Sequence, residues 1–283
     1  MPNYYLGIAD LHEGSEFALV PPPEQRRLIG MDRDRPAYNL RRKMVNRLRK
    51  QQADHWAAFV QLLKQIPKCK AVFILGDLGE GTQKKTGGAQ LITPNVDDQK
   101  DMTLRILRMI LKSAGYPPVF GCRGTGYHVT GPGGQEYEDA VYADLNNIVG
   151  WDDVMSVKAG GIIWRLQHFV PRSSVPYGKQ TPLAKEIVMN TLQAAAGIEH
   201  DADVMLYGHV HYSVLASYPM AGKTAVSLPT LKLRGEQYGR KYHDFYDVGL
   251  LLFEQERDGD KAIRVRPLEI GVHRKLPKLW KVK

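Results

Sequence analysis

The chain has 283 residues, a hydrophobic fraction of 43% and a formal net charge of +9 at pH 7. This hydrophobic fraction is ordinary for a globular protein with a sizeable core. No apolar run is long enough to cross a bilayer, and the two cysteines, Cys69 and Cys122, argue against a disulfide framework. Because no secretory leader follows Met1, we expect a cytoplasmic protein, or one in the host cytoplasm if a phage encodes it.

The first third of the chain alternates strand and helix. An apolar strand is predicted at 4–9, and a long helix around 40–65, where apolar residues recur with a period near 3.6. A second strand follows at 70–75. After an aperiodic stretch at 79–95, a second helix is predicted at 97–113.

The middle of the chain continues this alternation, and the last quarter changes to short strands. The alternation runs through a strand at 118–121, a helix near 136–147, a strand at 160–168, a helix at 181–196 and a strand at 203–207. Further strands are predicted at 213–219, 223–228, 246–255 and 261–268. Such a chain can build two packed mixed β-sheets with helices on both outer faces. We expect one α/β domain over 1–283, a four-layer αββα sandwich.

Five short groups of metal-binding residue types each follow a predicted strand. They are Asp10-Leu11-His12, Gly76-Asp77, His128, His168 and Gly208-His209-Val210-His211. Carboxylates and imidazoles gathered at the ends of adjacent strands are what a two-metal hydrolytic centre requires. No cysteine belongs to the set, which argues against a structural zinc site.

The five groups differ in how strongly each one, taken alone, predicts a metal site. Asp10 alone fits a helix or turn cap, His12 fits an exposed loop, and a Gly-Asp pair is common in turns. The pair His209 and His211 is a sharper signal, because two imidazoles so close together would repel each other if both were charged without a metal. The prediction of a metal centre therefore rests on the ordered set.

The ordered set resembles the motifs of the calcineurin-like metallophosphoesterases, and the resemblance covers residues 8–211. It implies two sheets between two layers of helices, with a binuclear metal centre at the strand ends. The compact chain looks like the members found in bacteria and their phages. We expect two divalent transition-metal ions, manganese first, with iron or zinc as alternatives.

The same resemblance assigns a role to each matched residue. By motif, Asp10, His12 and His211 would bind the first ion, His168 and His209 the second, and Asp77 would bridge both. The ions would activate a water for attack on a phosphate ester. Asp77 and His128 would be the catalytic residues, with His128 assisting the leaving group, a role typically worth about 10²–10⁴-fold in rate.

The third motif departs from the family pattern. Where the family has Gly-Asn-His, this chain has no asparagine between Gly121 and His128. Thr125 or Tyr127 occupies the region of the missing amide, and Arg123 could clamp a phosphate, so these three are candidate substrate-binding residues. We expect the second metal site to be weaker, differently ligated or empty at low metal.

A second departure follows the bridging aspartate. The family often has another aspartate three residues after it, whereas Glu80 stands there in this chain. Glu80 could support a metal ligand, but we expect it to lie in an exposed loop.

The positive charge leaves two interpretations of the surface. Basic residues crowd the start of the long helix at 41–50 and the tail at 273–283, and they either follow a nucleic-acid backbone or form a solvated basic surface. The favoured function is a metal-dependent phosphoester hydrolase of phosphodiesterase or nuclease type. The alternatives are a phosphomonoesterase acting on proteins or nucleotides, and a nucleic-acid-binding or assembly protein with little catalysis. No membrane partner is expected, and the oligomeric state is left open.

Overall fold

The computed structural model describes most of the chain. The described residues are 2–22, 38–83, 88, 90–129, 137–173, 175–233 and 246–271, with side chains left out at 38–47 and 129. The basic side chains at 41–47 and the tail at 273–283 lie outside this description. Their suggested contact with nucleic acid therefore stays a prediction.

The first sheet has six strands within the described ranges, in the order β11-β10-β1-β2-β3-β4. The bounds are Asn3–Ile8 for β1, Ala71–Leu75 for β2, Val119–Cys122 for β3, Ile148–Asp152 for β4, Gly249–Gln255 for β10 and Arg264–Glu269 for β11. Strands β1 to β4 are parallel, and β10 runs antiparallel to β1 and β11. β2 is buried along its whole length, as an apolar parallel strand covered on both faces should be.

The second sheet has five strands in the described part of the chain, in the order β5-β6-β7-β9-β8. The bounds are Val154–Ala159 for β5, Ile162–Gln167 for β6, Val204–Tyr207 for β7, Val214–Tyr218 for β8 and Lys223–Ser227 for β9. β6, β7 and β9 are parallel, and the antiparallel strands β5 and β8 form the two edges.

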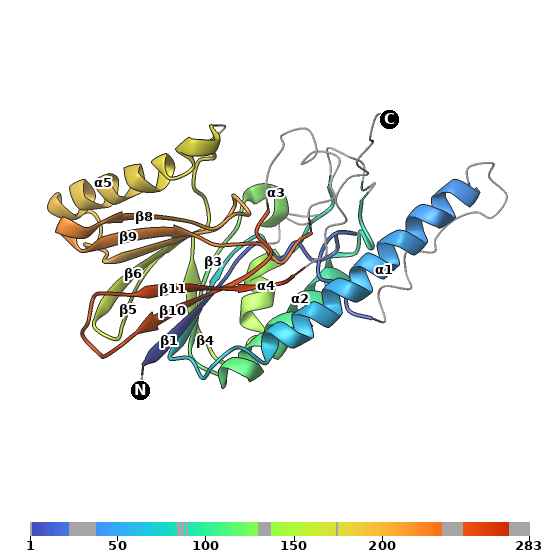
Figure 1. Cartoon of the computed structure of the whole chain (residues 1–283), viewed down its shortest axis with the longest axis horizontal. Helices are drawn as coiled ribbons and strands as arrows, with labels where there is room; N and C mark the ends of the chain where they lie inside the picture. The colour runs from blue at the N-terminus through green and yellow to red at the C-terminus, as the bar shows by residue number, and fades with distance from the viewer. Residues whose placement is uncertain are drawn as a thin grey trace, which may run out of the picture.

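Helices cover the outer faces of both sheets (Figure 1). They are α1 (Tyr38–Leu63), α2 (Val96–Ala114), α3 (Gly126–Val129), α4 (Tyr137–Ala143) and α5 (Thr181–Ala195), with short 3₁₀ turns η3 (Pro176–Gly178) and η4 (Pro219–Ala221). α1, α2 and α4 pack on the first sheet and α5 packs on the second, while Phe73, Trp164 and Phe253 fill the space between the sheets. The predicted αββα sandwich is confirmed.

Helix α2 shows why the sequence pattern predicted this helix. The Asn95 side chain accepts a hydrogen bond from the Asp97 N–H at 2.9 Å, and Gly115 ends the helix in the left-handed conformation, with φ of 85°. Between these caps, Leu104, Leu107 and Leu111 are buried against the sheet. None of the described helices is both long and apolar enough to span a membrane.

The prediction was wrong around residues 144–160. The helix predicted to reach 147 ends at Ala143, and β4 and β5 follow it, although neither strand was expected. Both strands are only partly buried, so their sequences lack the apolar run that marked β2. Sheet pairing with β3 and β6 decides their conformation.

Candidate metal centre

Five loops meet where the two sheets come together. The loops after β1 and β2 carry Asp10, His12 and Asp77, and those after β6 and β7 carry His168, His209 and His211; His128 lies in the short helix α3, in the segment after β3. The β1 and β2 loops continue side by side, because the Asp10 and His12 N–H groups donate to the Gly76 and Asp77 carbonyls. The carboxyl ends of the parallel strands therefore bring residues more than a hundred positions apart to one place.

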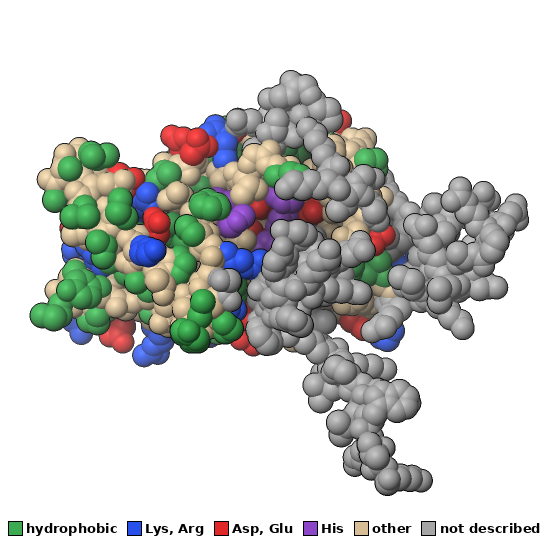
Figure 2. Space-filling view, turned by 90° about the horizontal axis from the view of Figure 1, so that it is seen from above, with side chains coloured by type: hydrophobic (Ala, Val, Ile, Leu, Met, Phe, Trp, Pro, Cys, Tyr) green, Lys and Arg blue, Asp and Glu red, His purple; other side chains and the backbone are tan. Residues whose placement is uncertain are grey.

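The structure brings all six predicted metal ligands together, and His128 with them. Within the described residues, three groups offer ligand atoms within 4.8 Å of one another: Asp10, His12 and His211; Asp77, His168 and His209; and His12, Asp77 and His128. Asp77 belongs to the second and third of these groups and His12 to the first and third, so the third group joins the other two. Histidine and acidic side chains reach the surface near the middle of the face shown in Figure 2.

The group of Asp10, His12 and His211 is called the first side here. The Nε2 atoms of the two histidines lie 3.0 Å apart, and Asp10 Oδ1 is 3.3 Å from His211 Nε2. Two imidazole nitrogens that face each other need either a proton or a cation between them. Burial raises the pKa of Asp10, but the charge of His211 and the hydrogen bonds from His12 and His211 hold it below its usual value, so the carboxylate is ionised.

The group of Asp77, His168 and His209 forms the second side. His168 Nδ1 lies 2.6 Å from the Leu75 carbonyl, which can only accept, so Nδ1 carries the hydrogen and a neutral ring would have a bare Nε2. That Nε2 atom is 3.1 Å from Asp77 Oδ2, and both side chains are buried. A buried lone pair that faces a carboxylate oxygen fits a shared metal ion.

The proton count of His168 supports the same interpretation. Burial lowers its pKa, but the Asp77 carboxylate outweighs burial and raises the pKa to about 10. Without a metal, a proton would therefore occupy the space between the two side chains. A divalent cation at the same place satisfies both ligand atoms.

The backbone at the centre is strained. Of the seven described non-glycine residues with positive φ, five are candidate ligands: Asp10, His12, Asp77, His209 and His211. Their φ values lie between 50° and 70°, a region that costs an ordinary residue about 1–3 kcal/mol. Strain concentrated at one cluster is typical of side chains that the fold holds in place for a functional site.

Two glycines allow the loops to approach closely. A Cβ atom on Gly124 would collide with Asp77, and one on Gly208 would lie 2.9 Å from both His168 Nδ1 and the Leu75 carbonyl. Larger residues at these positions would push the ligand loops apart. The glycines that flank the motifs are therefore required by packing.

Thr125 stands against Asp77 in the region of the missing asparagine. Its backbone N–H and its hydroxyl both donate to Asp77 Oδ1, at 2.7 and 3.1 Å. The hydroxyl also lies 3.3 Å from Asp77 Oδ2, the oxygen that faces His168. Thr125 therefore contacts both oxygens of the carboxylate and makes its shorter hydrogen bonds to Oδ1.

The other two candidate substrate-binding residues lie on opposite sides of this turn. The Tyr127 ring packs edge-on against His128, with centroids 4.8 Å apart, and 39% of Tyr127 is exposed. The Arg123 guanidinium forms ion pairs with Asp139 at 2.9 Å and Asp153 at 3.2 Å. Arg123 would have to exchange these carboxylates for a phosphate, so its predicted role as a clamp stays a prediction.

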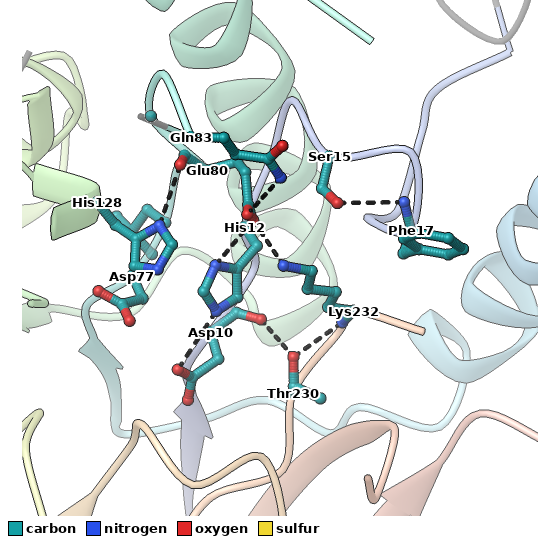
Figure 3. A network of polar contacts seen from close by, with 12 residues as sticks. Asp10, His12, Ser15, Phe17, Asp77, Glu80, Gln83, His128, Thr230 and Lys232 are labelled. Carbon is teal, nitrogen blue, oxygen red and sulfur yellow. Dashed lines mark hydrogen bonds and ion pairs between the residues drawn. The ribbon is translucent and has the colours of Figure 1, made fainter. Parts of the chain in front are cut away.

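The expectation that Glu80 lies in an exposed loop is wrong. Only 3% of Glu80 is exposed, and its Oε2 atom lies 2.6 Å from Lys232 Nζ and 3.1 Å from His12 Nδ1 (Figure 3). Its Oε1 atom accepts a hydrogen bond from Gln83 at 2.8 Å. The Glu80 N–H donates to the Glu13 carbonyl, which folds this segment over His12. Glu80 therefore orients a candidate ligand.

Sequence reasoning missed two further buried residues. Lys232 is 1% exposed and reaches Glu80 from the loop after β9, 152 positions away. Glu138, at the start of α4, accepts hydrogen bonds from the Leu78 N–H at 2.9 Å and the Gly124 N–H at 2.6 Å. Burial and the Asp77 charge raise the Glu138 pKa to about 7. No local sequence signal marks either residue, because each acts on loops that are distant in the chain.

Comparison with known proteins gives no match to a protein-family model and none to a curated protein. Among solved structures, the chain is similar to Vps29 from Chaetomium thermophilum, with 14% identity over 94% of this chain and 96% of that chain and a TM-score of 0.41. Zinc-bound Vps29 from Entamoeba histolytica has 15% identity over 95% and 99%, with a TM-score of 0.36.

A conserved uncharacterized protein from Streptococcus pneumoniae, described as a predicted phosphoesterase, has 9% identity over 94% of this chain and 98% of that chain, with a TM-score of 0.35. Likenesses this distant carry no activity over to this chain. Its own fold and side chains define it as an α/β sandwich protein with residue groups suited to divalent metal ions.

Proposed function

We propose that this chain is a metal-dependent phosphoester hydrolase with a binuclear centre, of phosphodiesterase or nuclease type. The observation that carries the proposal is the position of Asp77. It lies 3.1 Å from His168 on the second side, and it also shares a group of ligand atoms with His12, which belongs to the first side. A carboxylate shared by two histidine-rich groups is suited to hold two cations at the short separation that two-metal hydrolysis uses.

The side chains divide the work of hydrolysis between them. Bound divalent ions would supply an activated water and neutralise charge on the phosphoryl oxygens. His128 Nδ1 donates to the Glu80 carbonyl at 3.0 Å, so a neutral ring has a bare Nε2, and His128 would deliver a proton from Nε2 to the leaving oxygen as the doubly protonated imidazolium. Thr125 orients Asp77 from the other side.

We propose manganese as the native metal, with iron or zinc as alternatives. The centre is built from imidazoles and carboxylates, a ligand set that suits borderline transition metals better than calcium. We further propose that residues 1–283 act as one domain in the cytoplasm, with a phosphoester as substrate.

Hydrolysis of bis-p-nitrophenyl phosphate and p-nitrophenyl phosphate with added manganese tests the proposal. We expect turnover of the diester, lost in Asp77→Asn and retained in Asp203→Asn. Asp203 is a buried aspartate that binds the Ile163 N–H and Lys261, away from the centre, so it is a matched control. Full activity in Asp77→Asn would refute the proposal, and faster turnover of the monoester would favour a phosphomonoesterase.

One observation favours a second candidate, a nucleic-acid-binding or assembly protein with little catalysis. The asparagine that would bind the second ion is missing from this turn. Thr125 lies there instead and donates two hydrogen bonds to Asp77 Oδ1. Metal analysis after dialysis against manganese separates the two candidates. Fewer than one ion per chain, together with no turnover of either ester, would favour the binding protein.

A further inference from the structure

The segment between β6 and α5 borders the candidate centre and alternates aromatic with basic residues. This β6–α5 loop, described at residues 169–173 and 175–180, begins directly after the candidate ligand His168 and carries Phe169, Arg172, Tyr177 and Lys179. Neither the metal centre nor the fold accounts for the exposed rings in it. Half of Phe169 and 94% of Tyr177 are exposed to solvent.

Phe169 is held beside the second side of the centre. Its ring centroid lies 4.9 Å from that of His209, with the planes at 46°. The next residue, Val170, is 1% exposed and packs in the core under α5, so Phe169 cannot turn inward without displacing it. An apolar ring kept half in water next to a polar centre is unfavourable unless a ligand covers it.

The far end of the loop contacts the residue that follows a candidate ligand. The Lys179 ammonium lies 4.2 Å from the centroid of the Tyr212 ring, and Tyr212 follows the ligand His211. Tyr177 stands two residues before Lys179 on the turn η3, which a hydrogen bond from Gly178 N–H to the Val175 carbonyl at 3.0 Å stabilises. The loop therefore holds the rings of Phe169 and Tyr177 and the ammonium of Lys179 in a defined conformation.

We infer that the β6–α5 loop binds single-stranded nucleic acid, with Phe169 and Tyr177 stacking on bases and Lys179 lying near a phosphate. Stacking rings interleaved with cations are the features that recognise an unpaired strand independently of its sequence. A duplex hides the faces of its bases and would leave the rings uncovered. This inference rests on the proposed function and deepens it, because it names the phosphodiester that the centre would cleave.

Binding of labelled oligonucleotides to the full chain tests the inference. Fluorescence anisotropy is measured in EDTA, which prevents cleavage, with a thymidine oligomer of about 20 nucleotides and an abasic oligomer of the same length and charge. We expect the wild-type chain to prefer the thymidine oligomer. Phe169→Ala and Tyr177→Ala should each weaken its binding by about 5- to 100-fold and leave binding of the abasic oligomer unchanged.

Two variants control this measurement. Tyr218→Ala removes a tyrosine that is 57% exposed on the edge strand β8, and it should bind as the wild type does. Phe169→Trp keeps a stacking ring and should retain the preference for bases. A uridine oligomer run in parallel distinguishes RNA from DNA as the bound strand.

Equal binding of the thymidine and abasic oligomers by the wild-type chain would overturn the inference, and so would unchanged affinity in the Phe169→Ala/Tyr177→Ala double variant. Turnover of bis-p-nitrophenyl phosphate is measured separately with manganese. Base-dependent binding without turnover would refute the hydrolase and leave the loop assignment standing. Turnover without base-dependent binding would refute the loop assignment and leave the proposed hydrolase standing.

Discussion

The two sides of the metal centre are supported in different ways. On the first side, the carboxylate of Glu80 holds His12, and Lys232 in turn neutralises Glu80. On the second side, His168 is held by a backbone carbonyl, and the half-exposed ring of Phe169 packs against His209 with the ring centroids 4.9 Å apart. Buried charged side chains therefore orient a ligand of the first side, whereas a backbone carbonyl and an aromatic ring contact the ligands of the second side.

This difference teaches how ligands of the same type acquire different affinities. A carboxylate behind an imidazole raises its basicity and fixes its tautomer more strongly than a carbonyl does. We therefore expect the first side to bind metal more tightly than the second. The weaker second site inferred from the missing asparagine stays a prediction, and Thr125 on Asp77 Oδ1 supports it.

The largest effect is expected from Asp77, which belongs to the second side and also shares a group of ligand atoms with His12 of the first side. Asp77→Asn should lower kcat/KM on the diester by about 10³–10⁴-fold, because it removes the negative charge that lies between the two sides. His209→Asn, which alters the second side alone, should cost less. Steady-state kinetics at saturating manganese checks both variants, and equal losses would mean that Asp77 serves only one side.

Glu80→Gln breaks the support of the first side. Loss of the carboxylate behind His12 should weaken metal binding there by about 10–100-fold and leave the second side nearly unchanged. Cobalt titration followed by visible absorption resolves the two steps. Glu199→Gln, which breaks an ion pair with Arg165 away from the centre, is the matched control.

A second variant separates ligand support from fold stability. Glu80→Gln alone leaves the Lys232 ammonium buried without its carboxylate, which should lower the free energy of unfolding. Glu80→Gln/Lys232→Met removes that charge and should recover stability without recovering metal affinity. Recovery of both would show that Glu80 acts only through the fold.

At low pH the protein can lose bound metal or it can unfold, and these two effects must be distinguished. The buried residue His55 on α1 gives the unfolding a pH dependence of its own. Burial lowers the His55 pKa from 6.5 to about 4. Between these values the unfolded chain binds the proton first, so stability falls as pH falls, by about 1.4 kcal/mol at pH 5.5 and about 3 kcal/mol near pH 4. Urea unfolding in EDTA should show a shallower pH dependence in His55→Leu, and an unchanged slope would refute this assignment.

The smallest effect is expected at Thr125. Thr125→Val removes the hydroxyl bond to Asp77 Oδ1 and keeps the shorter bond from the backbone N–H. The loss of one hydrogen bond to a carboxylate, about 1 kcal/mol, should change second-side affinity by roughly 5-fold or less. Cobalt titration measures the affinity of the second side. If Thr125→Val weakened metal binding there as much as Glu80→Gln weakens it on the first side, the second side would not be the less supported of the two.

Much of the fold was predictable because local patterns agreed with the final packing. The apolar run of β2 and the capped, periodic α2 are buried as their sequences indicate. β4 and β5 were not predictable, because half-buried edge strands carry little signal and depend on their partners. The candidate metal ligands were predictable because each lies within four residues of the end of a strand.

The sequence by itself determined the ligand types, their order and their places after strands, since these are properties of short segments. Tertiary structure alone decided which ligands share a side, that Glu80 lies inward against Lys232, and that Glu138 joins the loops after β2 and β3. These contacts join residues between 14 and 201 positions apart. Burial then makes each charge depend on partners that only the packed sheets bring close.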